Sequence, residues 1–191
     1  FNLASMLIKG DGIPQNKNEA LNLFKKSAEM GDINAMKSLG YLYSQGKIYP
    51  ADLEKSAHYT KMAADRGDVQ SMFQYGEMLS EGIGVSNSKI GASIYLKIAA
   101  DCGSVRAMTN YGVMLIEGEG IPVNYNEGIK YLKMAANKNF PNAYMALFQT
   151  IFKLNGYPLD NEHFYESVSK YLLNPNNLNN EMKDAIKYIK K

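Results

Sequence analysis

Small and apolar residues recur every 36 residues along most of the chain, and this period is the main pattern in the sequence. The small pairs with this spacing are Ser27-Ala28, Ala63-Ala64, Ala99-Ala100 and Ala135-Ala136. The same interval separates Gly40, Gly76 and Gly112, and no insertion is needed from Ala4 to Ala136. A period of about 20–50 residues is typical of structural units that stack on one another, because one unit cannot bury its apolar surface alone.

Helix boundaries follow the same period and divide each unit into two helices. Residues whose side chains cap a helix N-terminus stand at Asn16, Asp52, Ser88 and Asn124. Residues that tolerate a left-handed backbone, and so end a helix, stand at Gly31, Gly67, Gly103 and Asn139. Glu19 and Glu127 follow their caps by three residues, which predicts capping boxes. We therefore expect A helices over 1–8, 33–44, 69–80 and 105–116, and B helices over 17–30, 53–66, 89–102 and 125–138.

A glycine in the middle of the A helices needs an explanation, since it destabilises a helix by ~1 kcal/mol relative to alanine. Its recurrence at Gly40, Gly76 and Gly112 indicates that something offsets this loss. We expect each A helix to approach the alanine pair of its B helix closely at this point. The pattern predicts an all-α fold, an α-solenoid of antiparallel helix pairs in which stacking of neighbouring repeats buries the apolar faces.

The repeat pattern predicts a single solenoid domain with six parts. These are a partial first repeat (1–32), three full repeats (33–68, 69–104 and 105–140), a degenerate repeat (141–174) and a C-terminal capping helix (175–191). The fifth unit is degenerate because Phe148 stands where the period places a glycine, and Tyr171-Leu172 replace the alanine pair. The last segment follows Asn174-Pro175-Asn176-Asn177, and its apolar residues share one helix face, which suits a cap over the last open interface.

The string Ala-x-x-x-Leu-Gly-x-x-Tyr-x-x-Gly, complete over 35–46, resembles the Sel1-like repeat, a relative of the tetratricopeptide repeat. The resemblance covers residues 2–140 in register and 141–174 loosely. The chain departs from the family where a tryptophan of helix B is usual, at Leu23, Tyr59, Tyr95 and Tyr131. The second linker glycine is Ile48 in one unit, and the cysteine pairs of the secreted branch of the family are missing.

The resemblance implies a right-handed superhelix with a concave surface lined by the A helices. It also implies adaptor work, which in this family includes ubiquitin-ligase complexes of membrane-protein quality control and bacterial or host signalling assemblies. The partners would be other proteins, bound through peptide or helix segments.

Composition narrows the class of partner. The chain has 191 residues and a net charge of only +2, which argues against a nucleic-acid binder. Cys102 is the only cysteine, so this segment has no internal disulfide. That fits a reducing compartment such as the cytoplasm, and the lumen of the endoplasmic reticulum stays open. No run of 18 apolar residues exists, so we expect no membrane insertion in this segment.

Candidate catalytic and cofactor chemistry is sparse, and we expect neither an enzyme nor a bound cofactor. His58 and His163 are the only histidines and have no partner at a metal-ligand spacing. The Gly82-Ile83-Gly84 fragment lacks the third glycine and the preceding strand of a phosphate-binding loop, so it is interpreted as a turn between helices. Cys102 lies near a helix C-terminus, where the negative end of the helix dipole disfavours a thiolate nucleophile.

Positions of the A helices that the repeat does not dictate are the candidate partner site, and we interpret them as exposed. The apolar members form a strip rimmed by charged residues, which suits an extended peptide or a helix in a groove. The residues are Asn34, Lys37, Tyr41, Phe73, Glu77, Arg106, Thr109, Val113, Met145 and Gln149. The alternative interpretation is scattered surface hydrophobic residues with no common role.

Two functions remain from the sequence. The first is a non-catalytic protein–protein interaction scaffold or adaptor. The second is a regulatory repeat module of a larger enzyme whose catalytic domain lies outside this segment. Because the first repeat is partial, we also expect an exposed apolar edge that could mediate self-association.

Overall fold

The computed structural model describes residues 1–154, and these residues form nine α-helices and no strand. The first compact unit, Phe1–Ser104, contains α1 to α6. Its helices are α1 (Asn2–Lys9), α2 (Lys17–Glu29), α3 (Ile33–Gln45), α4 (Leu53–Asp65), α5 (Val69–Glu81) and α6 (Lys89–Asp101). The second unit begins at Val105. Its described helices are α7 (Val105–Glu117), α8 (Tyr125–Ala136) and α9 (Pro141–Leu154).

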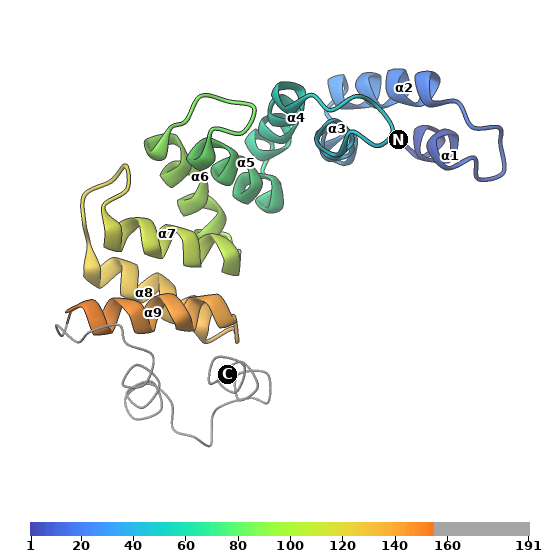
Figure 1. Ribbon diagram of the computed structural model, residues 1–191. Coiled ribbons are helices and arrows are strands. Elements are labelled where there is room, and N and C mark those ends of the chain that lie inside the picture. The colour runs from blue at the N-terminus through green and yellow to red at the C-terminus, as the bar shows by residue number, and fades with distance from the viewer. Residues whose placement is uncertain (155–191) are drawn as a thin grey trace. The chain divides into compact units, whose positions relative to one another are not determined.

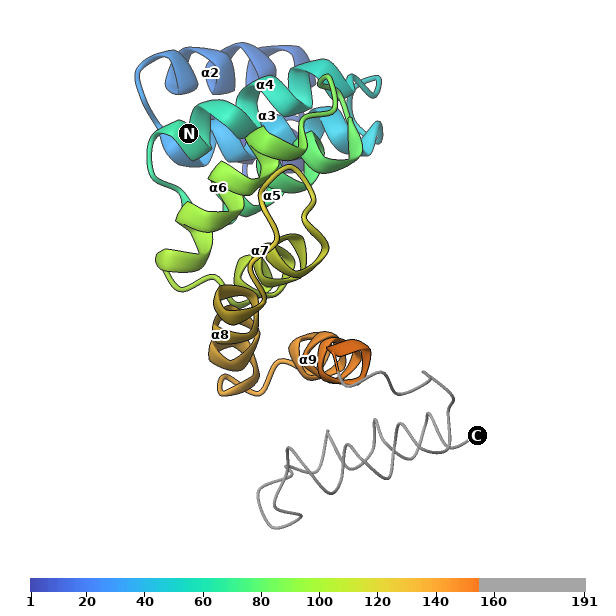
Figure 2. The same cartoon turned by 90° about the vertical axis from the view of Figure 1, so that its left-hand side faces the viewer.

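Within the first unit the helices form two layers (Figures 1 and 2). The A helices α1, α3 and α5 lie in one layer, and the B helices α2, α4 and α6 lie in the other. The predicted all-α fold of helix pairs is confirmed, and each predicted helix from 1 to 138 starts and ends within two residues of its expected bounds. Residues 155–174 of the degenerate repeat and the predicted capping helix at 175–191 lie outside the described residues.

The N-cap residues of the B helices act as predicted. The side chains of Asn16, Asp52, Ser88 and Asn124 each accept a hydrogen bond from the backbone N–H three residues later. The predicted capping box differs in one respect, because Glu19 accepts a hydrogen bond from the Asn16 side-chain amide at 2.9 Å. The Asn16 backbone N–H is already used, since it donates to the Leu7 carbonyl of the preceding A helix at 3.0 Å.

This bond between the cap residue and the preceding A helix recurs in every described repeat. Each acceptor carbonyl lies nine residues before its cap, near the C-terminal end of the A helix. The pairs are Asn16 to Leu7, Asp52 to Tyr43, Ser88 to Leu79 and Asn124 to Leu115. This hydrogen bond joins the end of the A helix to the start of the B helix, across the linker between them. It thereby fixes the antiparallel register of the pair.

The mid-helix glycines do mark a close approach, but the predicted partner was wrong. A Cβ on Gly40 would lie 2.8 Å from the Thr60 hydroxyl and 3.5 Å from the Ser56 carbonyl, both in α4. A Cβ on Gly76 would lie 2.8 Å from Leu96 Cγ. The alanine pair Ala63-Ala64 lies nearer the end of α4. In an antiparallel pair, the middle of one helix faces the middle of the other, so Gly40 meets residues 56–60 instead.

Aromatic pairs reinforce three of the described helix pairs at the positions where tryptophan would be usual, whereas the first pair has Leu23 there. The rings of Tyr75 and Tyr95 meet edge to face, with their centroids 4.9 Å apart. Tyr111 and Tyr131 make the same contact in the second unit at 5.0 Å. Edge-to-face contacts of this kind stabilise by about 0.5–1.5 kcal/mol beyond the burial of the rings. Tyrosine therefore takes the place of the larger ring in these three pairs. None of the described helices has the length and hydrophobicity needed to cross a membrane.

Two linker glycines offer a matched test of close packing in the first unit. Gly84 and Gly67 both have a positive φ, +67° and +93°, but a Cβ on Gly84 would overlap the Leu53 carbonyl oxygen, whereas one on Gly67 meets nothing within 4 Å. Backbone strain alone should make Gly67→Ala destabilising by about 1–3 kcal/mol. Overpacking should add about 1–3 kcal/mol more for Gly84→Ala. Chemical denaturation followed by circular dichroism measures both, and equal losses would contradict the close approach at Gly84.

Candidate functional site

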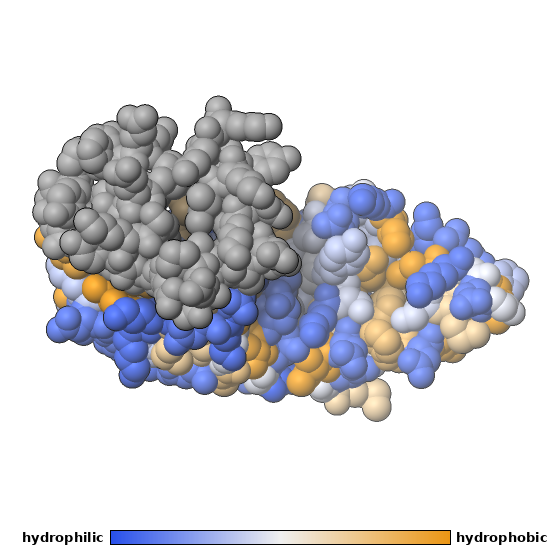
Figure 3. All heavy atoms as spheres, turned by 90° about the horizontal axis from the view of Figure 1, so that it is seen from below, coloured by the Kyte–Doolittle hydropathy of each residue, from blue (hydrophilic) through white to orange (hydrophobic). Residues whose placement is uncertain are grey.

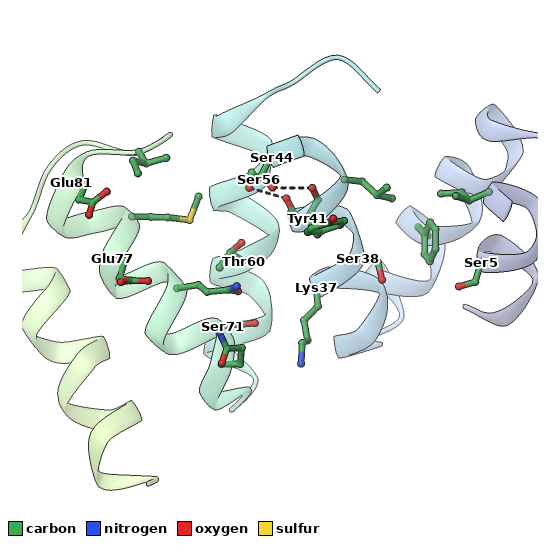
Figure 4. A pocket seen from close by; sticks show the side chains of 18 of the residues that line it. Ser5, Lys37, Ser38, Tyr41, Ser44, Ser56, Thr60, Ser71, Glu77 and Glu81 are labelled. Atoms are coloured by element: carbon green, nitrogen blue, oxygen red, sulfur yellow. Dashed lines mark hydrogen bonds between the residues drawn. The ribbon is translucent and has the colours of Figure 1, made fainter. Parts of the chain in front are cut away.

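A groove of about 680 Å³ lies over the A helices of the first unit (Figure 4). Residues of α1, α3 and α5 line it, and α4 contributes Ser56 and Thr60 between α3 and α5. On the face seen in Figure 3, hydrophobic and hydrophilic residues of the first unit are interspersed rather than gathered in one apolar patch. The groove is therefore a mixed surface, suited to a ligand with both polar and apolar groups.

The α5 side of the groove is a polar stripe of four side chains. Gln70, Gln74, Glu77 and Glu81 are spaced by four, three and four residues, so they share one face of the helix. Two carboxamides thus lie at the N-terminal half of α5 and two carboxylates at its C-terminal half. A carboxamide offers a donor and an acceptor to a ligand, whereas an ionised carboxylate only accepts.

The α3 side of the groove carries an exposed aromatic ring. Tyr41 is 62% exposed, and its ring projects beside Ser38 and Ser44. The Ser44 hydroxyl donates to the Tyr41 carbonyl at 2.9 Å, so this serine is occupied by its own helix. Tyr41 is the largest exposed apolar surface in the groove wall, and nothing in the packing of the repeat requires it.

Lys37 lies at the edge of the groove and is held in place by an ion pair. Its Nζ is 2.9 Å from Oδ1 of Asp68, the N-cap residue of α5. Burial alone would raise the pKa of Asp68. The hydrogen bonds from Lys37 and Ser71 outweigh burial, and the pKa of this carboxyl falls below its ordinary value of 3.8. The pair therefore stays ionised near neutral pH and ties α3 to the start of α5.

The hydroxyls of the groove floor are engaged in holding the helices together. The Ser56 hydroxyl of α4 donates to the Gly40 carbonyl of α3 at 2.8 Å, at the glycine contact between the two helices. The Ser71 hydroxyl donates to Oδ2 of Asp68 at 2.7 Å. Both serines are buried. They act as structural contacts rather than as groups offered to a ligand.

The structure brings together three of the residues predicted for the partner site. Lys37, Tyr41 and Glu77 all line the groove, and Asn34 is exposed on α3 outside it. The sequence missed Gln74 and Ser38, which also line the groove. The signal was available, because these two residues are 36 apart and stand four residues after Gln70 and Asn34.

The predicted exposure of Phe73 and Thr109 was wrong. Phe73 is only 2% exposed, and Thr109 is also buried, with its hydroxyl donating to the Val105 carbonyl in its own helix. Lys37 occupies the same position in α3 of the first unit. Its side chain reaches Asp68, the N-cap residue of α5, so in α3 this position lies on the flank toward the next helix pair of the same unit. Helix periodicity alone does not fix how wide the buried face of an A helix is.

The remaining predicted residues belong to the second unit. Arg106 and Gln149 are exposed there, and Met145 is half-buried. Val113 packs against the core formed by Ile116, Leu132 and Leu147, so its apolar side chain already has a structural role. A strip that runs through both units stays a prediction.

Other candidate chemistry lies away from the groove. His58 is exposed on α4, and its ring contacts the Tyr59 ring edge to face. Cys102 is exposed at the C-cap of α6. Residues 1–154 contain no group of three histidine, cysteine or acidic residues placed to hold a metal ion.

Comparison with known proteins places these features in one family. The model of the Sel1 repeat matches residues 1–32, 33–68, 69–104 and 105–140. The chain is similar to a crystallised Sel1 repeat protein from Oxalobacter formigenes, with 25% identity and a TM-score of 0.73, over 88% of this chain and 71% of that one. It shares the fold of c5321, a protective antigen present in uropathogenic Escherichia coli strains that displays an SLR fold. There the identity is 22% and the TM-score 0.72, over 88% of this chain and 37% of that one. No match is found among the curated proteins.

The ion pair at the edge of the groove predicts a pH-dependent stability. Asp68→Asn keeps a good N-cap and removes the charge, so we expect a loss of about 0.5–1.5 kcal/mol near neutral pH. Because the folded pKa of Asp68 is lowered from 3.8, its contribution is present above that value and is lost as the pH falls through the folded pKa. The difference between wild type and variant in urea denaturation should therefore shrink between about pH 7 and about pH 2.

Asp32→Asn is the matched control. Asp32 caps α3 at the same position of its repeat, but its carboxylate accepts from the Ser27 hydroxyl, and no lysine among residues 1–154 forms an ion pair with it. The loss should be smaller there. A loss at Asp68 that is the same at both pH values would assign the effect to the cap geometry instead of the ion pair.

Proposed function

Since the chain belongs to the Sel1 repeat family, whose repeats generally serve as protein–protein interaction modules, we propose that it holds an extended peptide of a partner protein in the groove of its first unit. Members of this family are typically non-catalytic scaffolds. In this proposal the chain recruits a partner into a larger assembly, of the kind found in protein quality control or signalling.

The exposed ring of Tyr41 is the observation that carries the proposal. An aromatic side chain that is 62% exposed in the wall of a groove loses little conformational entropy when it is covered, because it has only two rotatable side-chain bonds. Tyrosine is among the residues that dominate binding energy at protein interfaces. Tyr41 would supply the apolar contact, and the polar side chains around it would orient the bound peptide.

The α5 stripe favours an extended peptide over a helix. The carboxamides of Gln70 and Gln74 can donate to and accept from a peptide backbone only where that backbone has unpaired N–H and C=O groups. An extended segment offers such groups along its length, whereas the middle of a helix has used them internally. The carboxylates of Glu77 and Glu81 lie farther along the same stripe and would disfavour acidic side chains on the peptide.

Panning the full chain with an unbiased library of random peptides tests the proposal directly. Affinities of selected peptides for variants can then be measured by calorimetry. Tyr41→Ser should weaken binding by about tenfold or more, which corresponds to ~1.4 kcal/mol or more. Gln74→Ala should weaken it as well, with the melting temperature unchanged within a few degrees because both side chains are exposed.

Met30→Ser is the matched control, because Met30 is 88% exposed at the C-cap of α2 but does not line the groove. Its affinity should equal that of the wild type. Phe73→Ser is unsuitable as a test, since emptying a buried aromatic position destabilises by about 3–5 kcal/mol and would confuse folding with binding. If no peptide is selected, or if Tyr41→Ser binds as tightly as wild type, the groove does not have this function.

A further inference from the structure

A column of three isoleucines faces solvent on α6, in the B layer of the first unit. Ile90, Ile94 and Ile98 are 65%, 55% and 42% exposed. They are spaced by four residues, so they form one continuous ridge along the helix. None of the three lines the groove over the A helices. An exposed ridge of branched apolar side chains on a helix is the kind of surface that packs against another helix.

The other repeats provide an internal comparison for this column. The same three positions carry Asn18, Asn22 and Lys26 in α2, Glu54, His58 and Met62 in α4, and Asn126, Lys130 and Met134 in α8. Eight of these nine side chains are exposed, and only Met62 is partly buried. The repeat fold therefore does not require isoleucine at these positions. The apolar ridge is a property of α6 alone among the described B helices.

We infer that this ridge is the contact surface of a symmetric homodimer, in which α6 of one chain packs antiparallel against α6 of a second copy. Ile94 lies within one residue of the middle of the 13-residue helix. A two-fold axis through Ile94 therefore sets it against itself and sets Ile90 against Ile98 of the other copy. Two ridges of residues spaced by four interdigitate in the commonest class of helix packing, at a crossing angle of about −50°.

The charges beside the ridge favour a second copy over an anionic surface. Lys97 forms an ion pair with Asp101 on the same helix at 2.7 Å. Lys89 donates to the Ser80 hydroxyl at 2.9 Å. A helix that binds anionic lipid carries an excess of unpaired basic side chains around its apolar face. Here Lys97 is compensated by Asp101 and Lys89 is engaged with Ser80, so the ridge is not flanked by the unpaired basic side chains that an anionic surface would attract.

The size of the ridge sets the expected strength of the dimer. A helix of 13 residues is about 20 Å long, and one such helix on each side gives less than the ~800 Å² per partner of a standard stable interface. We therefore expect a weak, concentration-dependent dimer, with a Kd between about 10 µM and 1 mM.

Sedimentation equilibrium of the full chain over this concentration range tests the inference. Wild type should pass from monomer to dimer, and Ile94→Asn should remain monomeric, with an unchanged circular dichroism spectrum because Asn22 occupies the same position in α2. Leu3→Asn, at an exposed apolar position on α1, is the control and should dimerise as wild type does. A wild type that is monomeric throughout, or a dimer lost in Leu3→Asn but kept in Ile94→Asn, would overturn the inference.

Cysteine cross-linking in a Cys102→Ser background tests the antiparallel geometry. Ile94→Cys should form an interchain disulfide on mild oxidation, because the two-fold axis passes through this position. Ile90→Cys alone should not, since two copies of residue 90 would lie about 12 Å apart along the helices, beyond disulfide reach. A mixture of Ile90→Cys and Ile98→Cys chains should cross-link to each other. Equal cross-linking of all three single variants, or binding of wild type to anionic vesicles with no dimer, would refute the proposed pairing.

Discussion

The close approach of the two helices within each pair is the constraint on which the rest of this structure depends. Where the backbone of an A helix meets the middle of its B helix, there is no room for a side chain, and glycine stands at Gly40, Gly76 and Gly112. The Ser56 hydroxyl bonds to the carbonyl of Gly40 at this point, so the contact is polar as well as tight. Once the pair is fixed in this way, the direction of every outward side chain on both helices is fixed too. The groove of the A layer and the ridge of the B layer both follow from that rigidity.

The features that the sequence predicts well are those decided within one repeat. Caps such as Asp52, and terminating glycines such as Gly67, act on their own helix, and their effect depends on a few adjacent residues. The period then supplied independent copies of each signal, so the bounds of the helices could be placed closely. The features that were mispredicted depend on contacts between elements. Phe73 was expected to be exposed because helix periodicity alone does not say how wide the buried face of an A helix is.

The candidate site was predictable only in part for the same reason. Tyr41 and Glu77, which the sequence predicts to share a surface, both line the groove of the first unit. The ion pair of Lys37 with Asp68 joins residues that are 31 apart in the chain, and no local pattern indicates it. Gln74 was missed although it follows the 36-residue period, because a polar residue on an exposed helix face does not by itself indicate a binding role. Its importance depends on the groove, which is a property of three helices together.

The bond from each cap residue back to the preceding A helix has a consequence for how the array can grow or shrink. The backbone N–H of Asn16 donates to the Leu7 carbonyl, and the three equivalent cap residues make the same hydrogen bond. Donor and acceptor are nine residues apart in all four cases, so this hydrogen bond fixes the length of the linker between the two helices. An extra or missing residue there would separate the donor from its acceptor and shift the facing helix out of register with the glycine contact. Changes in length are therefore accommodated by whole repeats, duplicated or deleted as units, and a gene rearrangement that respects the 36-residue step leaves every internal contact of the pair intact.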